Sequence, residues 1–359
     1  MTYVLLLLGL AILVLGAELL VRGAVTLAEA ARISPLVIGL TVVAFGTSAP
    51  ELAVSSVSSL KGDAAIALGN VVGSNIFNVL LILGVSAVIV PLSVSSQLVR
   101  FDVPIMIAAS VVVWLAASDG TVQRWEGGGM LVAFLLYTGW LIRAGRKEPQ
   151  PNDSQTDFAV PPVSWRKWIG NLVMLLIGLG LLVVGADLLV DSATVIARQF
   201  GVNDLVIGLT IVAAGTSLPE LATSIVAAIR GQRDIAVGNI VGSNVFNLLM
   251  VLATAAVVAA DGVPVANSVL WFDLAVMLGV AVLCWPIFLS HAVVSRAEGI
   301  VMLLLYLFYN GLLIGGVMQS QWVSTAKNYL VFAAMPLVLV AVSYIAWKQH
   351  RRESPRDVT

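Results

Sequence analysis

The sequence predicts an all-α integral membrane protein with two inverted-topology repeats of five transmembrane helices and an eleventh C-terminal helix. Of its 359 residues, 59% are hydrophobic and only 11% are charged, whereas charged residues make up about a quarter of a soluble domain. The apolar residues gather in windows long enough to cross a bilayer. Polar motifs of the first half also return in the second half at one fixed offset. The net charge of −1 gives no sign of a nucleic-acid-binding surface.

Five apolar windows precede the first long polar segment, and about 20 apolar residues suffice for a membrane-spanning helix. They lie at 3–22, 35–60, 66–92, 102–118 and 126–144. The first window lacks a basic leader and a convincing cleavage site, so we expect a retained helix. The segment 145–165 is rich in Pro, Asp, Gln, Lys and Arg, and we predict a linker there.

Six further windows follow the linker. They lie at 168–190, 203–229, 235–260, 268–290, 297–317 and 328–347. We therefore assign a first transmembrane repeat to 1–144, a second to 166–317, an additional helix to 328–347 and a polar tail to 348–359.

The distribution of Lys and Arg predicts the orientation. With the N-terminus outside, fifteen of the 19 basic residues fall on the inner side and four on the outer side. Basic residues favour the cytoplasmic side of a membrane protein. We expect the linker and the C-terminus to be cytoplasmic, in the inner or plasma membrane of the cell.

The internal repeat is exact in spacing. At an offset of 169, without a gap, the segment "LVIGLTVVAFGTSAPELA" from Leu36 matches "LVIGLTIVAAGTSLPELA" from Leu205, and "GNVVGSNIFNVLL" matches "GNIVGSNVFNLLM". Glu18 meets Asp187 at the same offset. Because each unit holds an odd number of spans, the second unit must enter the membrane inverted, as in many secondary transporters.

Each repeat carries a proline-interrupted helix with an acidic residue. Pro50 and Pro219 have no N–H to donate, so each helix must kink or open one turn earlier. Backbone groups freed in hydrocarbon are tolerated where they line a cavity. Helical spacing places Thr47, Ser48 and Glu51 on one face. Their counterparts in the second repeat are Thr216, Ser217 and Glu220.

The helix after each interruption adds more oxygen-bearing side chains. Ser74 and Asn78 are four residues apart, as are Ser243 and Asn247. Small residues spaced GxxxG allow close helix contact, and these stripes are Gly69/Gly73 and Gly238/Gly242. We assign Glu18, Asp187, Asp102 and Asp273, which lie nearer to helix ends, to structural or interfacial roles.

The combined donor set favours a hard cation. Carboxylates, hydroxyls, amides and loosened carbonyls suit Ca²⁺ and Na⁺, whereas zinc and copper prefer sulfur and imidazole. Glu51 and Glu220 could together neutralise one divalent ion. A buried ionised carboxylate costs at least about 3 kcal/mol, so two at matched positions favour a functional role.

These motifs resemble a known family. The paired "GTSAPE" and "GTSLPE" segments, each followed by "GNxVGSNxFN", resemble the alpha repeats of the calcium/cation antiporter superfamily, most closely its bacterial sodium/calcium exchanger branch. The resemblance covers about 1–317, with the two motifs at 39–83 and 208–252. It implies a ten-helix core, central cation sites and alternating access by sliding of the first helix of each repeat.

The resemblance also implies which residues bind the ions. Glu51 and Glu220 would be shared carboxylate ligands, and Ala44 and Ala213 would offer backbone carbonyls. The remaining implied ligands are Thr47, Ser48, Ser74, Asn78, Thr216, Ser217, Ser243 and Asn247. This chain has Asn at 78 and 247, where sodium/calcium exchangers often carry Asp in one repeat. The driving ion and the stoichiometry therefore stay open.

The expected function is exchange of Ca²⁺ for Na⁺, with no cofactor and no enzymatic activity. Alternatives are an H⁺/Ca²⁺ or K⁺-dependent exchanger, a cation channel and an intramembrane hydrolase. A serine hydrolase would need a histidine at midplane depth, whereas His291 and His350 fall near helix ends. The expected partners are Ca²⁺, Na⁺ and the lipid bilayer; the sequence leaves the oligomeric state open.

Overall fold

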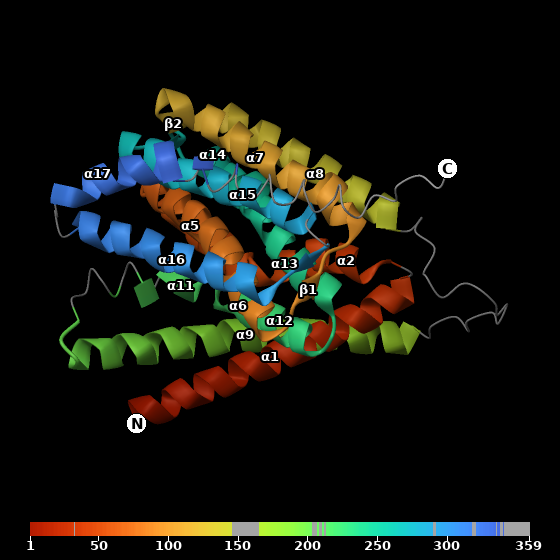
Figure 1. The fold of residues 1–359 in the computed structure, drawn as a ribbon. Helices are drawn as coiled ribbons and strands as arrows, with labels where there is room; N and C mark the ends of the chain where they lie inside the picture. Colours follow the sequence, from red (N-terminus) through yellow and green to blue (C-terminus); the bar gives the residue numbers. More distant parts are fainter. Residues whose placement is uncertain are drawn as a thin grey trace, which may run out of the picture.

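The protein is a bundle of long helices, described here from a computed structural model (Figure 1). The structure describes the chain except residues 32, 146–164, 203–206, 208, 209, 212, 290, 291, 318–320, 335, 338, 339 and 341–359. The predicted linker, 145–165, therefore lies almost wholly outside the described residues, and the polar tail, 348–359, lies wholly outside them.

The first half begins with one long helix and continues through broken ones. Its elements are α1 (Thr2–Ala31), α2 (Pro35–Ile38), η1 (Gly39–Val43), α3 (Ala44–Thr47), α4 (Ala49–Leu60), α5 (Ala64–Phe77), η2 (Asn78–Leu83), α6 (Gly84–Ile89), β1 (Leu92–Ser93), η3 (Leu98–Asp102), α7 (Val103–Ala116), η4 (Ala117–Asp119), β2 (Thr121–Val122) and α8 (Arg124–Gly145).

The second half repeats this order. Its elements are α9 (Trp165–Gln199), α11 (Ala213–Gly215), α12 (Leu218–Ile229), α13 (Arg233–Phe246), η6 (Asn247–Val251), α14 (Leu252–Val258), β3 (Val263–Pro264), η7 (Val269–Asp273), α15 (Leu274–Leu289), β4 (Val293–Val294), α16 (Arg296–Val317), α17 (Gln321–Tyr329) and η8 (Leu330–Ala334).

The described residues confirm an all-α membrane protein. Eight helices are long and apolar enough to cross a bilayer, and the bent pair Pro35–Thr47 and Ala49–Leu60 makes a ninth span. The matching span of the second half is described only in part, because several residues of 203–212 are not described. Half of the predicted eleventh helix, 328–347, also lies outside the described residues. The count of eleven stays a prediction.

Two helices are longer than the sequence predicted. The expected first span, 3–22, was too short, because α1 continues to Ala31. Its polar residues do not end the helix, since Arg22 pairs with Glu18 one turn away on the same helix. Likewise α9 reaches Gln199 instead of ending at about 190. At about 1.5 Å per residue both helices exceed a bilayer's hydrocarbon thickness.

The short strands show how the two halves pair. β1 pairs with β4 in antiparallel fashion, and β2 pairs with β3. Each pair joins one half of the chain to the other, and β1 and β3 occupy matching places in the two element orders. The β1–β4 pair and the β2–β3 pair are thus related to each other as an inverted repeat requires.

Glycines bring α1 and α9 into close contact along one edge of the bundle (Figure 1). A Cβ added to Gly16 would lie 2.8 Å from the Gly178 carbonyl oxygen, and one added to Gly178 would lie equally far from the Gly16 oxygen. Gly9 and Gly185 face each other in the same way. At the offset of 169, Gly16 corresponds to Gly185 and Gly9 corresponds to Gly178, so each contact is the counterpart of the other and the seam is two-fold symmetric.

The interior of the bundle is built around α5 and α13. The membrane windows that contain them are 72% and 83% buried, against 33% for α1. Each helix changes to a π-helical turn at an asparagine, Asn78 in the first half and Asn247 in the second. Single π turns occur frequently at functional sites. Both asparagines are predicted ligands, so the interior is where the site must be sought.

Candidate functional site

The two proline motifs break their helices in the same way. Ser48 has φ −85° and ψ 10°, and Ser217 has φ −92° and ψ 8°, so each serine leaves helical geometry just before its proline helix. In the first half the segments on either side of the break bend by 46°. The cause is the one expected from sequence: Pro50 and Pro219 cannot continue the hydrogen-bond ladder.

Glu51 and Glu220 lie at these breaks and are fully buried. Each accepts a hydrogen bond from the serine of the other half. The Ser48 hydroxyl donates to Glu220 Oε1 at 2.7 Å, and the Ser217 hydroxyl donates to Glu51 Oε1 at 2.9 Å. The carboxylates predicted from the repeat therefore belong to one site that both halves build.

The sequence predicts a shared helical face for the hydroxyls and the carboxylate of each repeat, and the structure adds partners that helical spacing does not predict. The hydroxyls of Thr47 and Ser48 donate hydrogen bonds across the interface, to Asn239 and to Glu220. The reason is the inversion. It brings the two breaks together, so that each serine finds the opposite carboxylate at hydrogen-bond distance.

A second set of contacts fixes the threonines. The Thr47 hydroxyl donates to Asn239 Oδ1 at 3.1 Å, and the Thr216 hydroxyl donates to Asn70 Oδ1 at 3.3 Å. Each asparagine amide in turn lies 3.0 Å from a serine oxygen of its own half, that of Ser55 for Asn70 and of Ser224 for Asn239.

The same amides reach the backbone of the carboxylate residues. Asn70 Nδ2 is 3.4 Å from the Glu51 carbonyl oxygen, and Asn239 Nδ2 is 3.4 Å from that of Glu220. These two asparagines thus tie each broken helix to the following helix and to the opposite half.

Four predicted ligands lie on α5, α13 and the π-helical turns after them. Ser74 Oγ is 3.1 Å from Ser217 Oγ, while Ser243 is fully buried and its hydroxyl has no partner in the described part of the chain. Asn78 Nδ2 donates to Asn244 Oδ1 at 3.0 Å. Among the described residues, both polar atoms of the buried Asn247 amide lack a partner. Ser74 and Asn78 are therefore held by hydrogen bonds, whereas Ser243 and Asn247 are not.

The two alanines stand at the start of the helical turn before each break. Ala44 begins α3, and its carbonyl oxygen accepts the Ser48 N–H at 3.0 Å and lies 3.4 Å from Thr47 Oγ1. Ala213 begins α11. Both stand where the resemblance places backbone ligands, and the Ala44 oxygen is already engaged within its own helix.

Several buried oxygens at the centre have no hydrogen-bond partner among the described residues. They include one oxygen of each carboxylate, Glu51 Oε2 and Glu220 Oε2, as well as Asn78 Oδ1 and Asn247 Oδ1. A buried polar atom without a partner costs about 1–3 kcal/mol. A hard cation can satisfy such oxygens, since Ca²⁺ takes about 6–8 of them.

Sequence reasoning missed four asparagines that shape the site: Asn70, Asn75, Asn239 and Asn244. Asn75 Nδ2 lies 3.4 Å from the Asn244 carbonyl oxygen, so α5 and α13 meet at these residues. All four stand within the repeated "GNxVGSN" motif, at the offset of 169. A polar residue kept in both copies of an apolar helix was the signal that could have found them.

One glycine stripe packs as predicted. A Cβ on Gly242 would lie 2.7 Å from the Leu40 Cα atom, and one on Gly238 would lie 2.9 Å from the Leu36 carbonyl oxygen. These contacts press α13 against the broken helix of the first half. The counterpart stripe, Gly69 and Gly73, has no atom of the described chain within 4 Å of an added Cβ, and several residues of 203–212 are not described.

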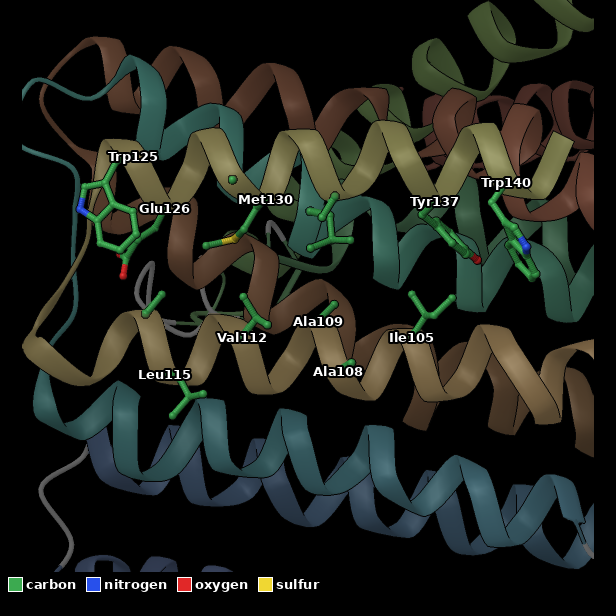
Figure 2. Close-up of a pocket in the computed structure, with 14 residues that line it drawn as sticks. Ile105, Ala108, Ala109, Val112, Leu115, Trp125, Glu126, Met130, Tyr137 and Trp140 are labelled. Atoms are coloured by element: carbon green, nitrogen blue, oxygen red, sulfur yellow. The ribbon is translucent and has the colours of Figure 1, made fainter. Parts of the chain in front are cut away.

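A cavity of about 680 Å³ lies away from the predicted ligands, between α7 and α8 (Figure 2). Its lining is mostly aliphatic and aromatic, with Trp125 near one end and Trp140 near the other. Glu126 is the charged residue in the lining, and it accepts a hydrogen bond from the Gln123 N–H. Since an ion needs several oxygens, this cavity does not suit one.

Known proteins share this sequence and fold. The family model described as sodium/calcium exchanger protein matches residues 1–143 and 170–315. The chain is 40% identical over 295 residues to the inner membrane protein YrbG of Escherichia coli, covering 78% of this chain and 88% of that protein. It is 31% identical over 340 residues to the sodium/calcium exchanger MaX1 of Methanosarcina acetivorans, covering 86% and 97%.

Solved structures agree with the sequence matches. The sodium-calcium exchanger NCX_Mj, in a crystal soaked with Na⁺ and without Ca²⁺, superimposes with a TM-score of 0.73 at 33% identity. The alignment covers 86% of this chain and 97% of that one. Since the family model spans most of the chain and both repeats, this protein belongs to the sodium/calcium exchanger family.

Proposed function

We propose that this protein is a secondary active antiporter that exchanges Ca²⁺ for Na⁺ across the inner or plasma membrane. One observation carries the proposal. Two fully buried carboxylates, Glu51 and Glu220, each accept a hydrogen bond from the opposite half and each keep one oxygen without a partner. The family assignment supports it, and MaX1 and NCX_Mj are themselves named sodium/calcium exchangers.

The donor set determines the class of ion. Described residues hold no cluster of three or more His, Cys, Asp or Glu side chains, so the site has only two carboxylates and must complete its coordination with neutral oxygens. Such sites favour hard cations over zinc or copper. Two ionised carboxylates match one Ca²⁺ in charge, or a set of Na⁺ ions. Ca²⁺ and Na⁺ are thus the cargo, and the mechanism that we propose uses no cofactor.

We assign the ligands as the repeat arranges them. Glu51 and Glu220 supply charge, and the neutral oxygens come from side chains and from the carbonyls of Ala44 and Ala213. The neutral side chains are Thr47, Ser48, Ser74, Asn78, Thr216, Ser217, Ser243 and Asn247. Asn70 and Asn239 are positioning residues, because their contacts reach the threonines and the carboxylate backbones and not a carboxylate oxygen.

Charge compensation explains why transport is an exchange. When empty, a site with two ionised carboxylates resists enclosure, because burying uncompensated charge costs several kcal/mol. Bound Ca²⁺ or Na⁺ cancels this charge and permits the site to close and reopen on the other side. The tight seam between α1 and α9 supports their movement as a pair past the site. Neither ion then crosses without a counter-ion.

We place the N-terminus outside and the C-terminus in the cytoplasm. The proposal rests on the count of fifteen basic residues inside against four outside. A reporter enzyme that is active only outside the cytoplasm, fused after Thr359, should stay inactive. An active fusion would contradict either the orientation or the eleventh helix.

Vesicle uptake tests the function. Purified protein in liposomes should take up radioactive Ca²⁺ when a Na⁺ gradient of the opposite direction is the only driving force. Imposed K⁺ or H⁺ gradients, each applied alone, test the K⁺-dependent and H⁺/Ca²⁺ alternatives. Uptake driven only by H⁺ would replace the Na⁺ assignment. Downhill flux without a counter-ion would indicate a channel, and absence of any flux would contradict a transporter.

A further inference from the structure

An ion cluster outside the proposed binding site joins α1 to the end of α12. Arg230 contacts the Glu18 carboxylate with two nitrogens: Nη2 lies 2.7 Å from Oε1, and Nε lies 2.9 Å from Oε2. Arg22, one turn along α1, lies 2.6 Å from the same carboxylate. The Glu18 side chain is only 17% exposed. A two-pronged arginine pair of this kind is among the stronger ionic contacts in proteins.

The repeat supplies a second copy of this cluster. At the offset of 169, Asp187 on α9 corresponds to Glu18, and Lys61 corresponds to Arg230. Both basic residues cap the C-terminus of the helix that carries a site carboxylate, Lys61 for α4 and Arg230 for α12. Within the part of the chain that the structure describes, however, Lys61 and Asp187 are exposed and form no ion pair.

The difference between the paired Glu18 and its counterpart Asp187, which forms no ion pair with a described residue, does not arise from the contact between α1 and α9. Their glycine seam is symmetric, since Gly16 meets Gly178 as Gly185 meets Gly9. The asymmetry lies in how this pair meets the rest of the bundle. α1 is tied to α12 by an ion pair, whereas the matching tie between α9 and α4 is open. A displacement of the α1 and α9 pair along the bundle accounts for both the closed contact of α1 with α12 and the open contact of α9 with α4.

We propose that Glu18–Arg230 and Asp187–Lys61 are two latches that close alternately. The inference rests on the alternating access of the proposed function. In an inverted repeat, the opposite state of the transporter is reached when the two halves exchange conformations. The contact seen at Arg230 must then open and its counterpart at Lys61 must form. The four residues set the equilibrium between the states without touching an ion.

Chemistry makes the two latches unequal. Arginine presents a planar fork that fits a carboxylate, whereas lysine is a compact charge on a flexible chain. The Glu18–Arg230 latch should therefore be the tighter one. In the absence of an ion gradient, the state shown here should be the more populated one.

Distances between spin labels test the proposal without relying on ion flux. The inner pair, Leu15→Cys with Ile229→Cys, reports the latch at Arg230. The outer pair, Val184→Cys with Leu60→Cys, reports its counterpart at Lys61. All four positions are exposed, and they correspond by the offset of 169. The native Cys284 is buried and should stay unlabelled.

In Glu18→Gln, the labels of the inner pair should lie farther apart in a larger fraction of molecules. The labels of the outer pair should at the same time lie closer together. The ratio of the two populations should change by about two- to fivefold, the range expected for loss of a partly exposed ion pair. The double variant Glu18→Lys with Arg230→Glu should restore both distributions. The control Arg22→Gln removes a contact within α1 and should leave both nearly unchanged.

The outcomes separate this proposal from the transport function. A change in the inner pair alone would reduce Glu18–Arg230 to a local contact, and no change in either pair would overturn the latches. Arg230→Lys provides a milder variant if Glu18→Gln fails to fold, and it should shift both pairs in the same direction. If the distances respond but vesicles show no exchange of Na⁺ and Ca²⁺, the latches stand and the transport assignment fails.

Discussion

The two halves of the chain agree closely in the contacts made at their broken helices, and they differ at the helices that follow and at the edges of the bundle. Ser48 meets Glu220 at 2.7 Å and Ser217 meets Glu51 at 2.9 Å, and the two Asn–Ser contacts are both 3.0 Å. Asn78 donates to Asn244, whereas the Asn247 amide has no partner among the described residues. Toward the surface, Glu18 is paired, while its counterpart Asp187 forms no ion pair with a described residue. The two-fold relation is therefore kept at the helix breaks and relaxed away from them.

A second difference concerns two buried carboxylates that hold neighbouring helices. The Tyr137 hydroxyl donates to Asp102 at 2.9 Å, and the Tyr309 hydroxyl donates to Asp273 at 2.8 Å. Asp102 is fully buried, whereas Asp273 is only partly buried and belongs to the segment that α17 covers, where Lys327 lies 4.4 Å from the Phe272 ring centre. The tyrosine–aspartate hydrogen bond therefore forms in a fully buried environment in the first half and in a partly buried one in the second half.

The largest effect should come from breaking the symmetric seam. In Gly178→Val the new Cβ would lie 2.6 Å from the Leu20 nitrogen, so α1 and α9 must separate. Overpacking of this kind costs about 1–3 kcal/mol or more, and here it acts against backbone. We expect a marked loss of thermal stability and of transport.

The matched control for the seam is Gly180→Val on the same helix. No described atom lies within 4 Å of a Cβ at that position. Its melting temperature in detergent and its vesicle uptake should stay near those of the unaltered protein. Equal stability of both variants would show that the seam is looser than the structure indicates.

The tyrosine bonds should rank next. Tyr137→Phe leaves an oxygen of the fully buried Asp102 without this donor, which should cost about 1–3 kcal/mol. Tyr309→Phe should cost less, because Asp273 is less deeply buried. Thermal unfolding of the two single variants measures the difference. A larger loss for Tyr309→Phe would contradict the argument from burial.

The smallest effect should distinguish the two asparagines of the site. Asn247→Asp adds charge where the amide has no partner, whereas Asn78→Asp replaces a donor to the Asn244 oxygen and so places two oxygens together. Both variants should still bind Ca²⁺ and should change the Na⁺ dependence of uptake. We expect the greater gain in Ca²⁺ affinity, up to about tenfold or roughly 1.4 kcal/mol, for Asn247→Asp.

That gain would appear as a lower Ca²⁺ concentration for half-maximal uptake in vesicles. Equal shifts in the two variants would mean that the Asn78 contact has no influence on ion binding.

Much of the architecture followed from the sequence, because the membrane limits the choices. Apolar windows located the spans, and the exact offset between Glu51 and Glu220 identified the repeat. Pro50 and Pro219 predicted the broken helices. Spacing could not reveal which residues meet across the halves, since the partner of Ser48 depends on how two inverted units dock. The helix face predicted for Thr47, Ser48 and Glu51 does not specify the partners that these side chains find in the opposite half.

Other features were missed for different physical reasons. The apolar window predicted for the first span ended at residue 22, yet the pairing of Arg22 with Glu18 allows α1 to continue to Ala31. Asn70 and Asn239 were missed because their contacts with Thr216 and Thr47 cross between the halves, which helical spacing cannot reveal. Asp102 was assigned a structural role, and its bond with Tyr137 is consistent with that role.

Counting bound Ca²⁺ tests the central claim, that both halves build one shared site, most directly. Equilibrium dialysis of purified protein with radioactive Ca²⁺, without Na⁺, should give one Ca²⁺ per chain, because Glu51 and Glu220 together balance a single divalent ion. Glu51→Gln and Glu220→Gln should each abolish this binding and Na⁺-driven uptake, with protein yield unchanged. Two Ca²⁺ per chain, with one retained in each single variant, would contradict the shared site.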